Sequence, residues 1–84
     1  MPYSLAFSKQ ALKELEKIND PFYSHIKQAI LNLTETPRPN GCKKLKGRDG
    51  YRIRVGNYRV IYDIFDEKLL IDVISLGHRR DIYK

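Results

Sequence analysis

Two kinds of hydrophobic pattern follow each other along the chain. Residues 3–7 alternate between outward and inward positions as a strand does, and Ser8 is placed to cap a helix by accepting a backbone hydrogen bond. Apolar residues then recur at helical spacing in two segments: Ala11, Leu12, Leu15 and Ile18, followed by Phe22, Ile26, Ala29, Ile30 and Leu33. Between them, Asp20 is the predicted N-cap of the second helix and Pro21 its first residue. Pro37 is expected to end that helix by disfavouring helical geometry at Thr36.

The second half of the chain has the pattern of an antiparallel sheet. Residues 42–47 form either a short strand or an irregular segment, and residues 51–55 alternate strictly. Gly56-Asn57 suits a two-residue hairpin turn, residues 58–65 form the next strand, and residues 68–75 form the last. The predicted fold is therefore α+β, in the order β-α-α-β-β-β, with two N-terminal helices on one face of an antiparallel sheet. The opposite face is left open.

A two-residue turn at Gly56-Asn57 fixes which side chains share a face. Arg54 then lies opposite Arg59, and Arg52 lies opposite Ile61. All three arginines point to the open face. The predicted helix-facing side chains are Ile53, Val55, Tyr58, Val60, Tyr62 and Ile64, joined by Leu69, Ile71 and Val73.

The predicted Arg54–Arg59 pair is unfavourable for folding. Like charges directly opposite each other destabilise a sheet by roughly 0.2–1 kcal/mol, so the pair indicates an anion-binding site. The alternative is a set of exposed arginines partly neutralised by Asp63 and Asp72, since Asp72 is expected opposite Ile61. Gly77 is expected to bend the chain after the last strand. The tail residues His78, Arg79 and Tyr83 would then lie beside the open face.

Charge along the chain is concentrated in its middle. The 84 residues, enough for one domain over 1–84, carry a net charge of +6. Residues 37–59 hold eight basic side chains and one acid, whereas residues 8–36 are balanced. This asymmetry favours a polyanionic partner, most often nucleic acid, over a merely solvated basic surface. The predicted nucleic-acid contacts outside the arginine cluster are Lys43, Lys44, Lys46 and Arg48, with a solvated loop as the alternative.

Several classes of protein are excluded by what the sequence lacks. Cys42 is the single cysteine, so no internal disulfide forms, and two histidines without a Cys/His cluster predict no metal site. No apolar run is long enough for a membrane span. We expect a cytoplasmic protein with no cofactor, no membrane association and no small-molecule substrate.

Three segments together resemble the RelE family of toxins from type II toxin–antitoxin systems. They are YRIRV at 51–55, NYRVIY at 57–62 and VISLGHRRDIY at 73–83, in the predicted element order, and the resemblance covers nearly the whole chain. It implies a metal-independent mRNA interferase that enters the A site of the 30S ribosomal subunit, cleaves the bound mRNA and so inhibits translation. It also implies a cognate RelB-type antitoxin as partner.

The resemblance assigns the catalytic role to five residues: Arg52, Arg54, Arg59, Arg79 and Tyr83. The first two positions are often lysine in RelE. Arginine does not give up its proton, so Arg52 and Arg54 are expected to supply charge and not proton transfer. Histidine exchanges protons near neutral pH, which makes His78 a candidate for proton transfer, with simple packing as the alternative.

Two other functions compete with the nuclease. A ParE-like toxin has the same fold but inhibits DNA gyrase and does not cut RNA; the complete arginine and tyrosine set argues for the nuclease. A non-catalytic RNA-binding module is disfavoured, because both helices are neutral and neither resembles a recognition helix.

Overall fold

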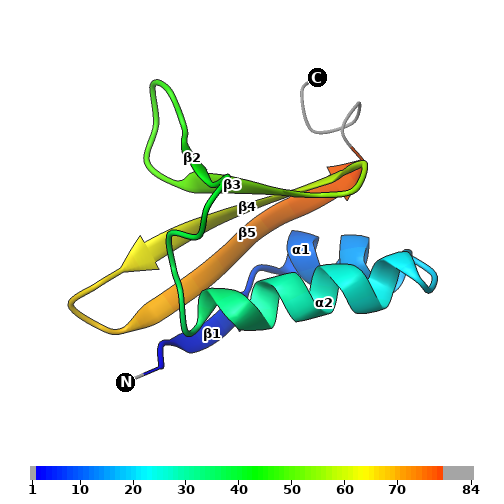
Figure 1. Ribbon diagram of the computed structural model, residues 1–84, viewed down its shortest axis with the longest axis horizontal. Helices are drawn as coiled ribbons and strands as arrows, with labels where there is room; N and C mark the ends of the chain where they lie inside the picture. Colours follow the sequence, from blue (N-terminus) through cyan, green and yellow to red (C-terminus); the bar gives the residue numbers. More distant parts are fainter. Residues whose placement is uncertain (1, 79–84) are drawn as a thin grey trace.

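A five-stranded sheet with both helices on one face makes up residues 2–78, the part of the chain that the computed structural model describes (Figure 1). The elements are β1 (Ser4–Phe7), α1 (Lys9–Glu16), α2 (Phe22–Leu33), β2 (Lys43–Lys44), β3 (Tyr51–Val55), β4 (Tyr58–Phe65) and β5 (Leu70–His78). The strand order is β1-β5-β4-β3-β2. The predicted α+β fold is confirmed, and of the two alternatives for residues 42–47 the short strand is the one that forms, as β2 at the edge of the sheet.

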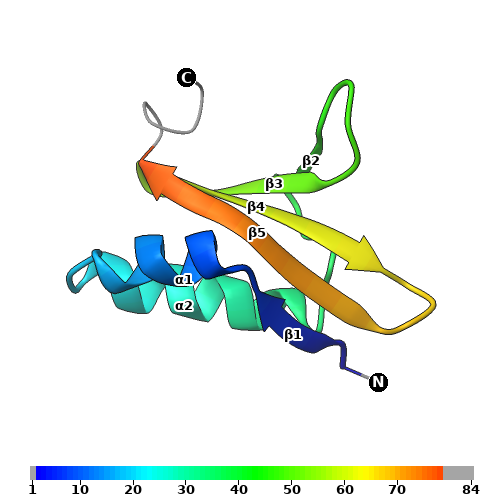
Figure 2. The same ribbon diagram turned by 180° about the vertical axis from the view of Figure 1, so that it is seen from behind.

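The first strand joins the sheet in parallel to the last. β1 pairs with β5 with Leu5 opposite Ile71, and the two run side by side in Figure 2. The pairs β5–β4, β4–β3 and β3–β2 are antiparallel, as predicted for the hairpins. The helices link β1 to the rest of the chain and pack back under the sheet, so neither helix covers the other face.

Ser8 begins α1 as predicted and also fastens it to the sheet. Its Oγ accepts a hydrogen bond from the backbone N–H of Ala11 at 3.0 Å. The same hydroxyl donates to the carbonyl of Ile74 at 2.5 Å, and the Ser8 N–H donates to the carbonyl of Val73 at 2.9 Å. Ala11 and Leu15 are then buried against the sheet.

The second helix begins one residue later, and ends earlier, than the sequence predicted. Pro21, not Asp20, is its N-cap, and the helix runs from Phe22. The Asp20 carboxylate instead accepts hydrogen bonds from the Oγ and N–H of Ser24, and these lower the pKa of Asp20. The helix ends at Leu33, before the restriction that Pro37 places on its neighbour can act.

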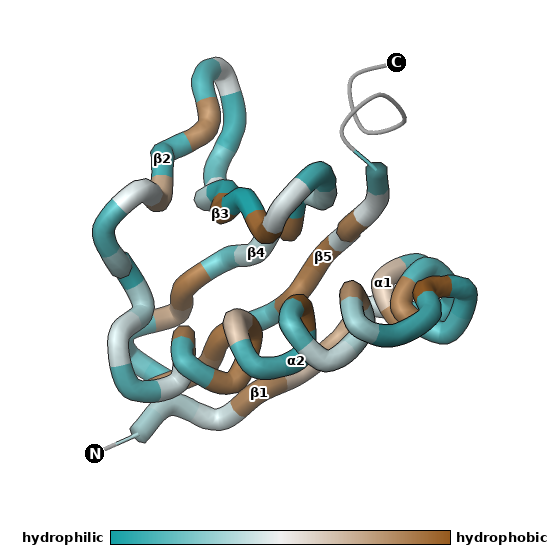
Figure 3. Tube along the Cα trace, turned by 45° about the vertical axis from the view of Figure 1, so that its right-hand side comes forward, coloured by the Kyte–Doolittle hydropathy of each residue, from teal (hydrophilic) through white to brown (hydrophobic). Residues whose placement is uncertain are grey.

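The hydrophobic core lies between the sheet and the helices. Figure 3 shows the hydrophobic segments of the sheet and of α2 facing each other, while the β2 loop is mainly hydrophilic. The fully buried core residues are Ala11, Ile26, Ile30, Leu33, Val60, Tyr62, Ile71, Val73 and Leu76. Tyr62 is held in place because its hydroxyl donates to the carbonyl of Pro37 at 2.8 Å.

Two expectations about the last strand are wrong. Leu69 does not join the core: it lies in the β4–β5 turn with φ +50° and is 39% exposed. Gly77 does not bend the chain, because β5 continues through it and pairs it with Arg59. The strand therefore starts at Leu70 and ends at His78, later than the predicted 68–75.

Candidate nucleic-acid interface

The β3–β4 hairpin has the predicted register. Gly56 adopts φ +61° in the turn, Val55 pairs with Tyr58, Arg54 pairs with Arg59, and Arg52 pairs with Ile61. Since Ile53 and Val60 are buried toward the helices, the pleat places the arginines on the open face.

The three arginines differ in how far they reach the surface. Arg54 is exposed, Arg52 is half-buried, and Arg59 is only 2% exposed. The neighbour of Arg59 on β5 is Gly77, which has no side chain and leaves space over the sheet for the long Arg59 side chain. An anion on this face would therefore contact Arg54 first, with the charge of Arg59 beneath it.

Beside these arginines a basic cleft of about 480 Å³ opens on the same face. Five of its eight lining residues are basic: Lys43, Lys44, Lys46, Arg48 and Arg52. Its wall is the β2–β3 loop, which rises from the sheet on the side away from the helices (Figure 1). The four predicted RNA-binding residues are thus brought together with Arg52, which sequence spacing alone did not show.

Gly50 closes the base of this loop. The N–H of Leu45 donates to the carbonyl of Gly50 at 3.0 Å, and Gly50 has φ +121°. A Cβ on Gly50 would lie 3.2 Å from Cδ1 of Leu45. The loop geometry therefore requires glycine at this position.

The two lysines of β2 lie on opposite sides of the sheet. Lys43 pairs with Arg52 and shares the open face, whereas Lys44 pairs with Tyr51 and places its Nζ 5.2 Å from the centre of that ring. The Arg38 guanidinium lies 5.2 Å from the same ring, and its Nε donates to the Tyr51 hydroxyl at 3.2 Å. The Tyr51 ring thus lies beside two cations. Of the two β2 lysines, Lys43 is the one whose register places it on the same face as the arginines.

An ion pair joins the loop that holds Arg38 to the turn between β4 and β5. Arg38 donates to the Asp66 carboxylate at 3.1 Å, and the Tyr3 hydroxyl donates to the same carboxylate at 2.6 Å. The hydrogen bonds from Arg38 and then Tyr3 lower the pKa of Asp66, while the bond to Asp66 raises the pKa of Tyr3. The sequence reasoning missed this network, because nothing in the local pattern links residues 63 positions apart.

Asp72 lies farther from the arginines than predicted. Ser75, not Asp72, is opposite Ile61, and Asp72 pairs with Asp63. Most of this shift comes from the turn after β4, which is two residues longer than predicted because Phe65 pairs with Leu70. A bulge between Ile61 and Tyr62, where β5 has Ile74 as an extra residue, adds one more position, and the Ser8 hydroxyl binds the carbonyl of that residue. Ser75, which the sequence analysis did not single out, therefore lines the basic cleft.

His78 lies on the other side of the sheet from the arginine pair. It ends β5, pairs with Tyr58, and its ring lies edge-on to Tyr58 at 5.7 Å. The expectation that it folds back beside the open face is therefore wrong, since register places it with the helix-facing residues. Arg79 and Tyr83 lie outside the described residues.

Two further features of residues 2–78 bear on the class of protein. No group of three or more His, Cys, Asp or Glu side chains in this part of the chain is arranged to hold a metal ion. No helix in it has the length and apolar character needed to cross a membrane.

The arrangement can bind an anionic chain without moving a proton. Permanently charged guanidinium groups stabilise phosphate and the extra negative charge of a phosphorane transition state. The cleft adds contacts along the phosphate backbone, which are insensitive to base sequence.

Comparison with known proteins points to one family. The family model described as "ParE toxin of type II toxin-antitoxin system, parDE" matches residues 5–83. The mRNA interferase toxin RelE of Escherichia coli K12 is 37% identical over 82 residues, which cover 94% of this chain and 85% of that protein.

Solved structures of relatives have the same fold. A RelE–RelB complex from Pyrococcus horikoshii matches with a TM-score of 0.83 and 30% identity, covering 94% of this chain and 97% of the matched chain. A mutant of the E. coli toxin RelE in the free state matches with a TM-score of 0.79 and 35% identity, covering 99% of this chain and 92% of that one. The intact E. coli RelBE toxin–antitoxin complex matches with a TM-score of 0.78 and 37% identity, covering 90% and 95%.

Proposed function

Because the chain belongs to the RelE and ParE family of toxins from type II toxin–antitoxin systems, we propose that it is a ribosome-dependent mRNA interferase. It cleaves mRNA in the ribosomal A site and so stops translation. The family model is named after ParE, but the relative at 37% identity and the matched structures are RelE proteins, so the gyrase-inhibitor alternative is not favoured. The match over residues 5–83 supports a single toxin domain.

One observation carries the proposal: an unfavourable arginine pair on an uncovered sheet face, next to a basic cleft. The 2′-hydroxyl of RNA loses its proton to a base and attacks the adjacent phosphorus. The bond to the 5′-oxygen breaks and that oxygen takes up a proton, which gives a 2′,3′-cyclic phosphate and a 5′-hydroxyl. Arg54 contacts the phosphate, Arg59 adds charge from beneath, and Arg52 positions the chain at the mouth of the cleft. Each stabilises the charge that develops on the phosphorane.

The remaining predicted residues complete this site. Arg79 adds charge at the leaving oxygen, and Tyr83 stacks on a base or handles a proton. His78 is given no step, because the sheet separates it from the arginine pair. Arginines hold charge without transferring protons, so most of the acceleration comes from the orientation that the ribosome imposes on the mRNA.

The basic cleft explains why RNA cleavage by this protein depends on the ribosome. Lys43, Lys46 and Arg48 line it and are exposed on the loop beside the arginines. They contact phosphates of ribosomal RNA, which brings the toxin to the A site without reading a base sequence. Its place of action is then the cytoplasm, where ribosomes translate mRNA.

A RelB-type antitoxin is the proposed inhibitor. The matched solved structures include RelE bound to RelB from E. coli and from P. horikoshii. A partner that covers the open face would block the arginines and the cleft together, which is sufficient to silence the toxin.

The test uses programmed ribosomes. Purified protein is added to ribosomes with a defined A-site codon, mRNA ends are mapped by primer extension, and gyrase supercoiling is measured alongside. We expect A-site cuts that Arg54→Gln reduces at least tenfold, whereas the control Lys13→Gln, on the exposed face of α1, leaves them unchanged. Intact mRNA together with blocked supercoiling would overturn the proposal.

A further inference from the structure

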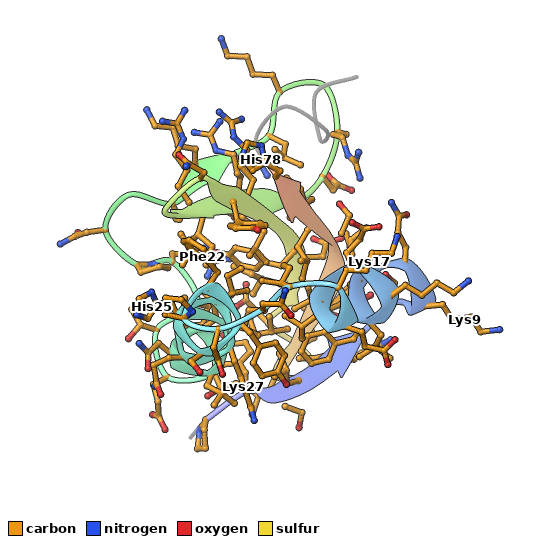
Figure 4. The ribbon with its side chains drawn as sticks, turned by 90° about the vertical axis from the view of Figure 1, so that its right-hand side faces the viewer. Lys9, Lys17, Phe22, His25, Lys27 and His78 are labelled. Atoms are coloured by element: carbon orange, nitrogen blue, oxygen red, sulfur yellow. The ribbon has the colours of Figure 1, made fainter. Side chains whose placement is uncertain are left out.

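Three aromatic rings form a continuous ledge at the end of the sheet next to the arginine pair. The rings of Phe22 and Tyr58 lie 5.9 Å apart, and those of Tyr58 and His78 lie 5.7 Å apart. They come from the start of α2, the start of β4 and the end of β5. Figure 4 looks onto this end, with His78 at the sheet and Phe22 beneath it.

The ledge is exposed to solvent and is not part of the buried core. Phe22 is 49% exposed, His78 is exposed, and Tyr58 is half-buried. Exposed aromatic side chains that touch each other add little to a core, and they are the surface on which nucleic-acid bases stack. Phe65 is comparably exposed, at 40%, but lies at the far end of β4 beneath the Lys68 ammonium.

Register places the ledge one step from the proposed phosphate site. Tyr58 directly precedes Arg59, and His78 directly follows Gly77, which pairs with Arg59. The rings point to the helix side and the arginines to the open side, so a strand of RNA reaches both by passing around the sheet end. The β3–β4 turn at this end is narrow. No atom lies within 4 Å of the place where a Cβ on Gly56 would be, so the path around the turn is open there.

We propose that this ledge of Phe22, Tyr58 and His78 stacks a base of the RNA whose neighbouring phosphate is held by Arg54, above the buried charge of Arg59. The ligand is an unpaired nucleobase, and aromatic stacking tolerates any base because each has a π-face. The proposal rests on the proposed function only in taking RNA as the bound molecule. It assigns His78 a stacking role in place of the proton transfer that its residue type suggested.

The test is a binding experiment with the full chain. The probe is a short single-stranded RNA that is 2′-O-methylated against cleavage and contains one 2-aminopurine, whose fluorescence is quenched when it stacks. We expect quenching with the wild-type protein. His78→Ala and Phe22→Ala should each weaken binding about fivefold or more and reduce the quenching. His78→Phe should restore both, and the control Phe65→Ala should leave both unchanged.

The outcomes separate this inference from the proposed function. If ribosomal cleavage occurs but quenching is the same in His78→Ala, Phe22→Ala and Phe65→Ala, the ledge proposal fails alone. If His78→Ala and His78→Phe both lose cleavage while quenching persists, His78 transfers a proton and the proposal is overturned. If the ledge variants lose only affinity for a RelB-type antitoxin, the ledge is a protein contact, which also overturns it. Thermal unfolding of each variant confirms that it is folded.

Discussion

The Arg54–Arg59 pair lowers the stability of the folded protein, and replacing Arg54 by threonine measures by how much. The two arginines are direct cross-strand neighbours, and Asp72, which was predicted one pair from Arg59, lies instead opposite Asp63. Arg54 is exposed, so removing its side chain leaves no cavity. Threonine also suits a strand. We therefore expect Arg54→Thr to be more stable than the wild type and to lose its RNA cleavage.

The size of the gain follows from the pair geometry. Two unit charges about 4 Å apart repel by roughly 1 kcal/mol in bulk water and by less at greater distance, and the repulsion is stronger where one of them is buried, as Arg59 is. Measured penalties for directly opposed like charges are about 0.2–1 kcal/mol. For a domain of this size, a gain of ~0.5–1 kcal/mol raises the Tm by roughly 2–8 °C.

Urea unfolding at two salt concentrations provides the assay. At 1 M salt the Debye length falls to about 3 Å, so the advantage of Arg54→Thr should shrink when NaCl is raised from 50 mM to that value. Arg54→Lys keeps the charge and is the matched control, for which we expect no gain at either concentration. A loss of stability in Arg54→Thr, or a gain that salt leaves unchanged, would refute the electrostatic reasoning.

Three other substitutions test separate parts of the structure. Ser8→Ala removes both the N-cap and the hydroxyl that binds the bulge, so urea unfolding should show a loss of about 1–2 kcal/mol. Gly50→Ala should destabilise the fold by roughly 1–3 kcal/mol and lower ribosome affinity, because φ +121° and the contact with Leu45 both oppose a Cβ. Asp66→Asn should be less stable than the wild type at neutral pH. That difference should disappear as the pH falls below about 4, because the Arg38 hydrogen bond lowers the folded-state pKa of Asp66 and acid protonates the unfolded carboxyl first.

The local rules predicted most of the fold from the sequence. The alternation at 51–55 and the Gly56-Asn57 turn were enough to fix the register, and with it the face of all three arginines. The Ser8 cap was equally local, since donor and acceptor are three residues apart. These features depend on backbone geometry over a few residues, where pattern and propensity act together.

The features that the sequence did not predict depend on contacts between distant segments. The bulge in β5 is bound by Ser8, which lies 66 positions away from Ile74 and donates its hydroxyl hydrogen to the extra carbonyl. That single extra residue brings Ser75, in place of Ile74, opposite Ile61 and into the cleft. The position of His78 was also not predicted. The face of the sheet on which its side chain lies is set by the continuation of β5 beyond the predicted end at residue 75.

The bulge also explains how the arginine end of the open face stays free of large apolar side chains from β5. Without it, the register that starts at Phe65 and Leu70 would bring Ile74 opposite Ile61 and Leu76 opposite Arg59. With it, Ser75 lies opposite Ile61 and Gly77 opposite Arg59, so that small residues lie beside the arginines. The fold thus contains two unfavourable like-charge pairs, Arg54 with Arg59 and Asp63 with Asp72, at different ends of the face. Separating the charges lowers stability and leaves the arginine end of the face available to RNA.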